Sequence, residues 1–307
     1  MNPDAYTIKE HFLDVGHGHT LYIHDWGNPK AKTPIVFLHG GPGAQCKDKH
    51  KLPFDPSTQR VIFHDQRGSG KSTPLGERHH NTTQELSDDI TRIADHLHID
   101  EFILTGESWG SCLALFYAIA EPKRVKALVI GAVFTASQAE IDWFDKGLLR
   151  THYPDAWERF LAATPKAHHS DAAAYHAARA LGKDASAAAE SARIYSELVS
   201  STMSLDDSFT PINTDDFDPS SMQLELSYLV KRCFLPDRFI MQNARKLTMP
   251  LYIVQGRYDF ICPPHTAYEL SQIAPDAHLT WVVSGHKSEH ENITAKRLIY
   301  RQVTGAA

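Results

Sequence analysis

The sequence has few cysteines, and they are scattered. Its 307 residues include four of them, Cys46, Cys112, Cys233 and Cys262, and no two form a CxxC pair. This usage is typical of a reduced compartment. Residues 1–6 also lack the basic-then-apolar pattern of a secretion signal. We therefore expect a cytoplasmic protein.

The sequence also lacks long apolar runs and any excess of positive charge. No run reaches the length of a membrane span, so we expect no membrane partner. Lysine and arginine total 31 against 37 acidic residues, a formal net charge of −6, and no basic stripe is present. Nucleic acids and anionic membrane surfaces are thereby excluded as expected partners. A hydrophobic content of 42% and a charged content of 22% are those of a globular protein with a full core.

Short apolar runs alternate with helical patterns through most of the chain. The predicted strands are an opening hairpin at 7–15 and 20–26, followed by runs at 34–38, 60–65, 101–105, 125–130, 251–254 and 279–283. The predicted helices of this alternating part span 84–97, 112–120 and 292–303. Continuous apolar strands separated by helices indicate an α/β fold with a mostly parallel central sheet.

The alternation stops between about residues 134 and 241. This stretch is rich in alanine and aromatic residues and has helical patterns only. We expect an α/β core at 1–133 and 242–307, interrupted by a helical cap at 134–241. Such a cap closes over the sheet edge and sets substrate choice.

The segment Gly106-Glu107-Ser108-Trp109-Gly110 reads G-x-S-x-G. A predicted strand precedes it and an apolar helix follows it. Strand, tight turn and helix form the context of a nucleophile elbow, in which the turn lifts the serine hydroxyl clear of the sheet. We therefore predict that Ser108 is a nucleophile.

A second glycine-rich turn, His39-Gly40-Gly41-Pro42-Gly43, follows the buried strand at 34–38. In hydrolases with an elbow, this loop supplies one backbone N–H to the oxyanion hole. Gly41 is the candidate donor because Pro42 has no N–H. The residue after the nucleophile, Trp109, supplies the other.

A serine hydroxyl needs a base and a carboxylate that orients the base. Asp259 and His286 each follow a late predicted strand, and the ends of parallel strands share one edge of the sheet. The order Ser108, Asp259, His286 is that of an α/β hydrolase. The sequence thus predicts a catalytic triad.

Two competing motifs need weighing. Residues 286–290 fit H-x-x-E-H, a zinc motif, but zinc would need this segment to be helical, and Ser284-Gly285 after a strand makes His286 a loop residue. Residues 65–72 nearly match a phosphate-binding loop. Asp65 stands where that pattern needs glycine, and a carboxylate there would repel phosphate. We expect neither a metal nor a nucleotide cofactor.

Together these segments resemble the proline iminopeptidases, which are serine peptidases of the α/β-hydrolase fold. The resemblance covers nearly the whole chain, and the motifs that carry it are HGGPG at 39–43, DQRGSGKS at 65–72, GESWGS at 106–111 and GRYD at 256–259. It implies a cofactor-free enzyme that acts on small peptides with an N-terminal proline. A carboxylesterase or amidase on the same core, or an aminopeptidase of other specificity, is the alternative; a non-catalytic binding protein on this scaffold is a further one.

The family holds the substrate's ammonium with two cap glutamates. Glu225 keeps the family spacing to the aromatic and Phe-Leu residues after the second of these. For the first, Glu197 is the nearest glutamate, whereas an ungapped match places Val199 there. Losing this glutamate would favour the esterase alternative. Gly131 stands where the family often has arginine.

The resemblance also implies an apolar pocket for the proline ring. Its members would be Phe134, Phe144, Leu229 and Cys262. The same four side chains would equally suit plain packing of the cap.

Overall fold

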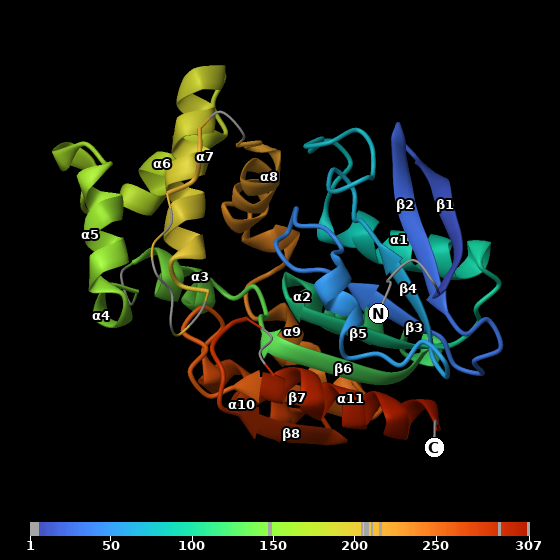
Figure 1. Cartoon of the computed structure of the whole chain (residues 1–307). Helices are drawn as coiled ribbons and strands as arrows, with labels where there is room; N and C mark the ends of the chain where they lie inside the picture. The colour runs from blue at the N-terminus through green and yellow to red at the C-terminus, as the bar shows by residue number, and fades with distance from the viewer. Residues whose placement is uncertain are drawn as a thin grey trace.

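An eight-stranded sheet forms the centre of the molecule (Figure 1). The structure is a computed structural model, and it describes residues 6–146, 149–203, 205, 209, 211–214, 217–287 and 290–305. The strands are β1 (Thr7–Gly16), β2 (His19–Gly27), β3 (Ile35–Leu38), β4 (Arg60–His64), β5 (Phe102–Ser108), β6 (Val125–Val133), β7 (Leu251–Gly256) and β8 (Ala277–Val282).

The order of the strands is β1-β2-β4-β3-β5-β6-β7-β8. The opening hairpin is antiparallel and pairs antiparallel with β4, and the strands from β4 to β8 pair in parallel. The predicted α/β fold with a mostly parallel sheet is therefore confirmed. The carboxyl ends of β3, β5, β7 and β8 consequently open on one edge.

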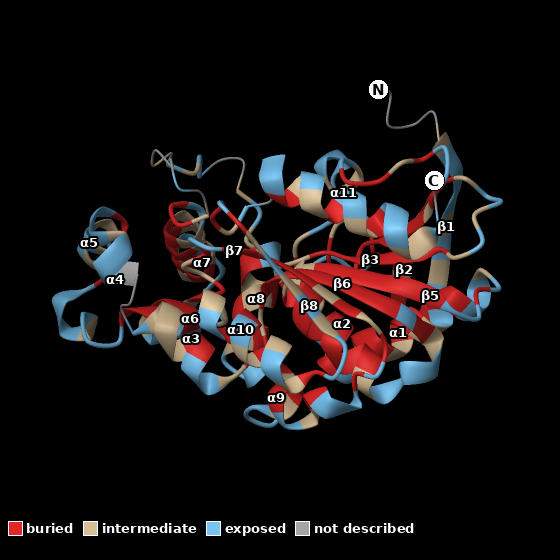
Figure 2. Cartoon of the chain, turned by 90° about the horizontal axis from the view of Figure 1, so that it is seen from below, coloured by how far each residue is buried: buried red, intermediate tan, exposed pale blue. Residues whose placement is uncertain are grey.

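Helices cover both faces of the sheet (Figure 2). Val36 and Leu38 of β3 pack with α1 (Thr83–His96) and α2 (Trp109–Ala120), in a cluster that also includes residues of α10 (Pro264–Ile273). The alternate residues, Ile35 and Phe37, pack on the opposite side with Tyr300 of α11 (His290–Thr304). Because both faces of β3 are covered, its sequence is a continuous apolar run.

The segment between β6 and β7 is helical, as predicted. It contains α3 (Gln138–Asp145), α4 (Leu149–His152), α5 (Pro154–Ala162), α6 (Ala172–Ala180), α7 (Ala185–Ser200), α8 (Ser220–Leu229) and α9 (Phe239–Asn243). Short 3₁₀ turns are η2 (Asp48–Lys51), η3 (Pro122–Arg124), η4 (Lys166–His168), η5 (Arg232–Phe234) and η6 (Ala244–Lys246).

The helices α4 to α7 stand beside the sheet rather than on its faces (Figure 1). Helices α5, α6 and α7 share a separate hydrophobic cluster with α8, which includes Phe160, Tyr195 and Leu226. Ile240 and Met241 of α9 instead pack in the cluster of the core. The division of the chain at residues 134 and 241 stays a prediction.

All four cysteines are free, and three of them are buried. Within the described ranges, no helix combines the length and the apolar character that a membrane span requires.

Candidate active site

Ser108 lies at the sharp turn between β5 and α2. Its backbone has φ 55° and ψ −128°, a left-handed conformation that costs energy for a residue with a side chain. A Cβ at Gly106 would lie 2.3 Å from the carbonyl oxygen of Gly110, and one at Gly110 would lie 2.2 Å from that of Leu38. Both flanking positions therefore require glycine, and the turn has the geometry expected of a nucleophile elbow.

The loop after β3 reaches the same point. A Cβ at Gly40 would lie 3.5 Å from the Cβ of Ser108, so the backbone of this loop passes directly beside the serine. Gly41 has φ +108°, which favours glycine, and it lines a cavity together with Ser108. The structure thus brings Gly41, Ser108 and its chain neighbour Trp109 together.

Gln66 connects this loop to the elbow. Its side-chain amide donates to the carbonyl of His39 at 2.9 Å, and its side-chain oxygen accepts from the indole N–H of Trp109 at 2.8 Å. The backbone N–H of Gln66 donates to the ring of His39 at 3.0 Å. These groups are buried, so the network holds the backbone of both glycine-rich turns in place.

The turn that resembled a phosphate-binding loop is filled by Asp65. Its carboxylate accepts hydrogen bonds from the backbone N–H groups of Cys46 and Lys71, each at 2.8 Å. One amide of this loop, that of Lys71, is therefore already engaged by a carboxylate.

Asp259 and His286 meet at the ends of β7 and β8. Nδ1 of His286 lies 3.1 and 3.0 Å from the two carboxylate oxygens of Asp259. The same carboxylate accepts from the backbone N–H groups of Ile261 and Cys262, at 3.0 and 2.8 Å. Asp259 is thus fixed by its own loop, and a carboxylate that faces Nδ1 favours the tautomer of His286 with its proton on Nδ1 and a lone pair on Nε2.

The environment of His286 sets its basicity. Burial lowers the pKa of His286. The charge of Asp259, its hydrogen bond and the charge of Glu225 raise the pKa by more than burial lowers it, so the pKa lies above its ordinary value of 6.5. Ser108 and His286 line one common cavity. The arrangement can activate a serine hydroxyl for acyl transfer.

A metal is the competing reading of these residues. His286 lies in a loop, whereas His290 is the first residue of α11, so they do not share a helix face; Glu289 lies outside the described residues. Asp259, Cys262 and His286 offer ligand atoms within 4.8 Å of one another. However, Asp259 and His286 engage each other, and the Asp259 carboxylate also accepts from the backbone N–H groups of Ile261 and Cys262.

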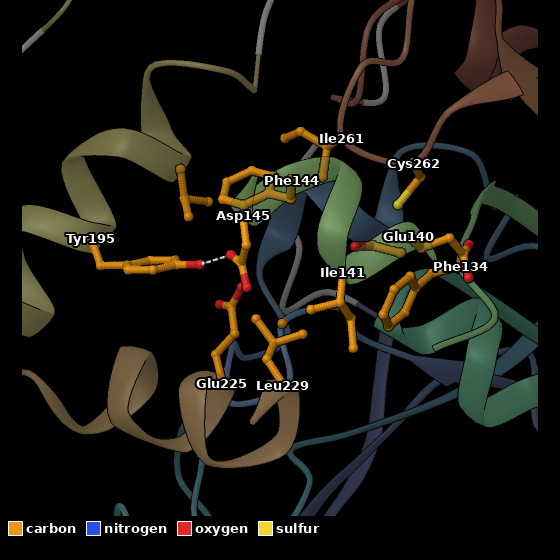
Figure 3. Close-up of a pocket in the computed structure, with 13 residues that line it drawn as sticks. Phe134, Glu140, Ile141, Phe144, Asp145, Tyr195, Glu225, Leu229, Ile261 and Cys262 are labelled. Atoms are coloured by element: carbon orange, nitrogen blue, oxygen red, sulfur yellow. Dashed lines mark hydrogen bonds between the residues drawn. The ribbon is translucent and has the colours of Figure 1, made fainter. Parts of the chain in front are cut away.

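A cavity of about 560 Å³, including its mouth, opens on one side of Ser108. We call it the ring cavity (Figure 3). Its lining residues are Gly41, Ser108, Phe134, Glu140, Ile141, Phe144, Asp145, Tyr195, Val199, Glu225, Leu229, Ile261 and Cys262. The structure therefore brings five of the predicted binding residues to one place: Phe134, Phe144, Glu225, Leu229 and Cys262.

Two carboxylates project into the ring cavity. Figure 3 shows Asp145 of α3 and Glu225 of α8 pointing toward one another. The hydroxyl of Tyr195 donates a hydrogen bond to Asp145 at 2.6 Å. In the described part of the chain no cation forms an ion pair with either carboxylate. Two such acids can hold a positively charged group.

The pKa values of both acids reflect this uncompensated burial. Burial raises the pKa of Glu225 to about 7, although His286 opposes the increase. Burial also raises the pKa of Asp145, and the hydrogen bond from Tyr195 offsets part of that effect. An ammonium placed between the two acids would stabilise both carboxylates.

The two helices that carry these acids are firmly attached to the core. The hydroxyl of Tyr228, one turn after Glu225, donates to the side-chain oxygen of Asn81 at 2.8 Å. The indole N–H of Trp143, in α3, donates to the carbonyl of Phe260 at 2.8 Å. These bonds link both helices to loops near the sheet edge and so position the acids relative to Ser108.

The structure does not bring Glu197 to the ring cavity. Its carboxylate pairs with Arg193 at 2.5 Å and accepts from the backbone N–H of Ile212 at 3.0 Å. Val199 lines the cavity instead. Residues two positions apart on a helix point about 200° apart around its axis, so Glu197 and Val199 face opposite sides of α7. The assignment of Glu197 to the binding site is therefore corrected.

Sequence reasoning did not identify Asp145. It follows Phe144 in a helix without any motif of its own, and nothing in the sequence relates it to Glu225. Tyr195 belongs to no motif either and is one of many aromatic residues of the cap. Only the packing of α3, α7 and α8 makes the three side chains neighbours.

A lysine lies beside Gly131, the position at which the family often has arginine. A Cβ at Gly131 would lie 2.6 Å from the carbonyl oxygen of Val254 and 3.3 Å from Nζ of Lys296. Lys296, from α11, is buried and forms an ion pair with Glu107, the residue before the nucleophile. A cation of α11 thus lies on the side toward which a Cβ at 131 would point, and the backbone at 131 has no room for a side chain.

Comparison with known proteins places the chain in a family. The family model described as the α/β hydrolase fold matches residues 33–292. Solved structures with the same fold include a proline iminopeptidase from Mycobacterium smegmatis, with a TM-score of 0.63 at 23% identity, covering 97% of this chain and 98% of that one. Another is MGS-M2, an α/β hydrolase enzyme from a deep-sea metagenome library, with a TM-score of 0.64 at 17% identity, covering 97% of this chain and 98% of that one.

Curated relatives are more similar in sequence. A probable proline iminopeptidase from Leptolyngbya boryana is 37% identical, covering 93% of this chain and 91% of the relative. The proline iminopeptidase of Arabidopsis thaliana is 36% identical, covering 94% and 77%. That of Xanthomonas citri is 35% identical, covering 96% of each chain. At this identity over nearly the full length, the chain belongs to the proline iminopeptidase family of α/β hydrolases.

Proposed function

We propose that the protein is a serine exopeptidase that releases an N-terminal proline from small peptides. The observation that carries the proposal is the ring cavity, in which two partly buried carboxylates face each other beside Ser108. A prolyl residue has an apolar ring and a secondary ammonium. Apolar walls and two unpaired acids match these two features.

The proposed reaction follows the acyl-enzyme route. Ser108 attacks the carbonyl carbon of the N-terminal proline while Nε2 of His286 accepts the serine proton. Asp259 orients His286 and stabilises its protonated form. The backbone N–H groups of Gly41 and Trp109 donate to the oxyanion. His286 then protonates the leaving amine, and water hydrolyses the prolyl ester of Ser108 by the same steps.

Asp145 takes the place of the first of the two cap glutamates with which the family binds the substrate's ammonium. With Val199 at the α7 position, Glu225 lacks the acidic partner from α7. Glu140 also lines the ring cavity, but its carboxylate already accepts hydrogen bonds from Thr135 and Ser137. Asp145 reaches the same point from α3 and is oriented by Tyr195. The substrate ammonium would then lie between Asp145 and Glu225, beside the side chains of Phe134, Phe144 and Leu229.

The first test is the release of an arylamine from proline arylamide, with alanine arylamide and a short acyl ester beside it. We expect a strong preference for proline, sensitivity to a serine-directed inhibitor and insensitivity to a chelator. Asp145→Asn should lower kcat/KM for proline arylamide at least about tenfold, because an acid that faces the ammonium is lost, and should affect the ester far less. Ester turnover without proline amide cleavage would instead identify an esterase on the same core.

We further propose that the protein works in the cytoplasm on free peptides, without a nucleic acid or membrane partner. The four free cysteines support a reduced compartment. The net charge of −6 opposes binding to polyanions.

A further inference from the structure

A second and larger cavity opens on the other side of the serine. It has a volume of about 1390 Å³, including its mouth, and Gly41, Ser108 and His286 are among its lining residues. Gly41 and Ser108 line the ring cavity as well. Since the ring cavity would hold the prolyl residue, the rest of a substrate must extend from the serine into this second space, which we call the leaving-side cavity.

The leaving-side cavity is strongly basic. Its described lining includes four lysines, Lys47, Lys49, Lys287 and Lys296, and one acid, Glu107. Glu107 is paired with the buried Lys296. Among the described lining residues, three lysines close to Ser108 therefore have no acidic partner in the cavity.

Three of these lysines lie near one another at the mouth. Lys47, Lys49 and Lys287 are exposed, and no ion pair is recorded for them within the described ranges. The pKa of Lys49 lies below its ordinary value because of burial and because of the charges of Lys47 and Lys287. The one acid of the adjoining turn, Asp48, is engaged with Lys51 at 2.8 Å. Three mutually repelling ammonium groups at a cavity mouth are suited to an anion.

We propose that the leaving-side cavity binds a carboxylate of the leaving amino acid or peptide. The inference rests on the proposed function, since it takes the leaving group to be a peptide. In a dipeptide or tripeptide, the C-terminal carboxylate lies within one or two residues of the scissile bond, at about 3.5 Å for each residue. An acidic side chain at the first position of the leaving group offers the same chemistry at a similar distance.

The two cavities together are complementary to a short zwitterionic peptide. Asp145 and Glu225 offer negative charge to its ammonium, and Lys47, Lys49 and Lys287 offer positive charge to its carboxylate. Ser108 lies between the two sets. This arrangement favours short peptides with a free C-terminus over peptides whose C-terminus is far away or blocked.

The test compares kcat/KM for three substrates: Pro-Ala, Pro-Ala-amide and Pro-Glu-amide. We expect Pro-Ala to exceed Pro-Ala-amide about three- to tenfold, as for a partly exposed charge-assisted contact. Since exposed charges are screened, the ratio should fall toward one in about 0.5 M salt. Pro-Glu-amide distinguishes the C-terminal carboxylate from an acidic side chain. If its kcat/KM equals that of Pro-Ala, the cavity binds either carboxylate. If its kcat/KM equals that of Pro-Ala-amide, the cavity binds only the C-terminal carboxylate.

The decisive variant is Lys47→Met combined with Lys49→Met. We expect it to reduce the ratio of Pro-Ala to Pro-Ala-amide to about one. Lys166→Met with Lys183→Met, which removes two exposed cap lysines, is the control for the same change in net charge and should keep the ratio. Lys49→Glu should invert the preference in favour of Pro-Ala-amide.

Two results would overturn the inference. One is equal kcat/KM for Pro-Ala and Pro-Ala-amide in the unaltered protein, with proline arylamide still cleaved, which leaves the proposed function intact. The other is a preference for the free acid that survives in the Lys47 and Lys49 double variant. If no proline substrate were cleaved at all, the proposed function itself would fail, and this inference with it.

Discussion

Replacing Glu225 by glutamine should make the protein more stable and a poorer peptidase at the same time. In the free protein, Glu225 is an acid in the ring cavity that has no cation partner among the described residues. Burial raises its pKa to about 7, against an ordinary value of 4.5. A raised pKa means that the folded state resists ionisation of this group, so the charge opposes folding.

The magnitude follows from the two pKa values. At 1.36 kcal/mol per pH unit, the gap between 4.5 and about 7 corresponds to about 3 kcal/mol. Below the unfolded pKa both states bind the proton and the cost is absent. It grows between the two values and is complete above the folded pKa. Glu225→Gln should therefore raise the free energy of unfolding by about 3 kcal/mol at pH 8, and by under about 1 kcal/mol at pH 5.

The assay is urea unfolding of both proteins at these two pH values. Comparing two pH values removes the constant cost of burying the glutamine amide. In parallel, kcat/KM for proline arylamide should fall at least about tenfold in the variant, with little change for a short acyl ester. A stability difference that does not depend on pH would refute the buried-charge reasoning. Equal losses on both substrates would refute the role in binding the ammonium.

Three further predictions concern the pH dependence of the reaction, the carboxylate of Asp259 and the tight turn at Ser108. As the pH is lowered, kcat/KM for proline arylamide should fall with a midpoint near or above pH 7. Protonation of His286 removes the base, and protonation of Glu225, with its pKa of about 7, removes the carboxylate that binds the amine. A midpoint near pH 4.5 would contradict this. Asp259→Asn should lower kcat by about 10⁴ with both the amide and the ester, because Nδ1 of His286 loses its acceptor, and near-normal ester turnover would exclude the triad. Gly110→Ala should lower Tm or prevent folding, because its Cβ would lie 2.2 Å from the carbonyl oxygen of Leu38; an unchanged Tm in thermal unfolding would show that the elbow can relax.

The core and the residues around Ser108 could be predicted because their placement follows from local rules. The alternation of apolar runs and helical patterns identified the strands that end beside Ser108, Asp259 and His286. Parallel strands place their carboxyl ends on one edge, so three residues far apart in sequence had to converge. The glycines of both tight turns likewise mark positions where the backbone has no room for a side chain.

The cap could not be predicted to the same depth. Its helices follow no rule that relates one to the next, and their faces are selected by packing alone. Glu197 is the nearest glutamate to the first family position, whereas the ungapped family spacing indicates Val199, and the orientation of α7 directs Val199 into the cavity. Glu225 was identified by spacing, whereas Asp145, its partner across the cavity, was not.

The sequence by itself thus determined the fold class, the nucleophile elbow and the order of the residues that meet there, because each depends on backbone constraints that glycine, proline and apolar patterns express directly. Only the tertiary structure decided which charges surround the serine. The pairing of Asp145 with Glu225 and the gathering of Lys47, Lys49 and Lys287 depend on how distant segments pack. Burial converts these placements into electrostatics, because a charge acquires its energetic weight from the neighbours and solvent that packing gives it.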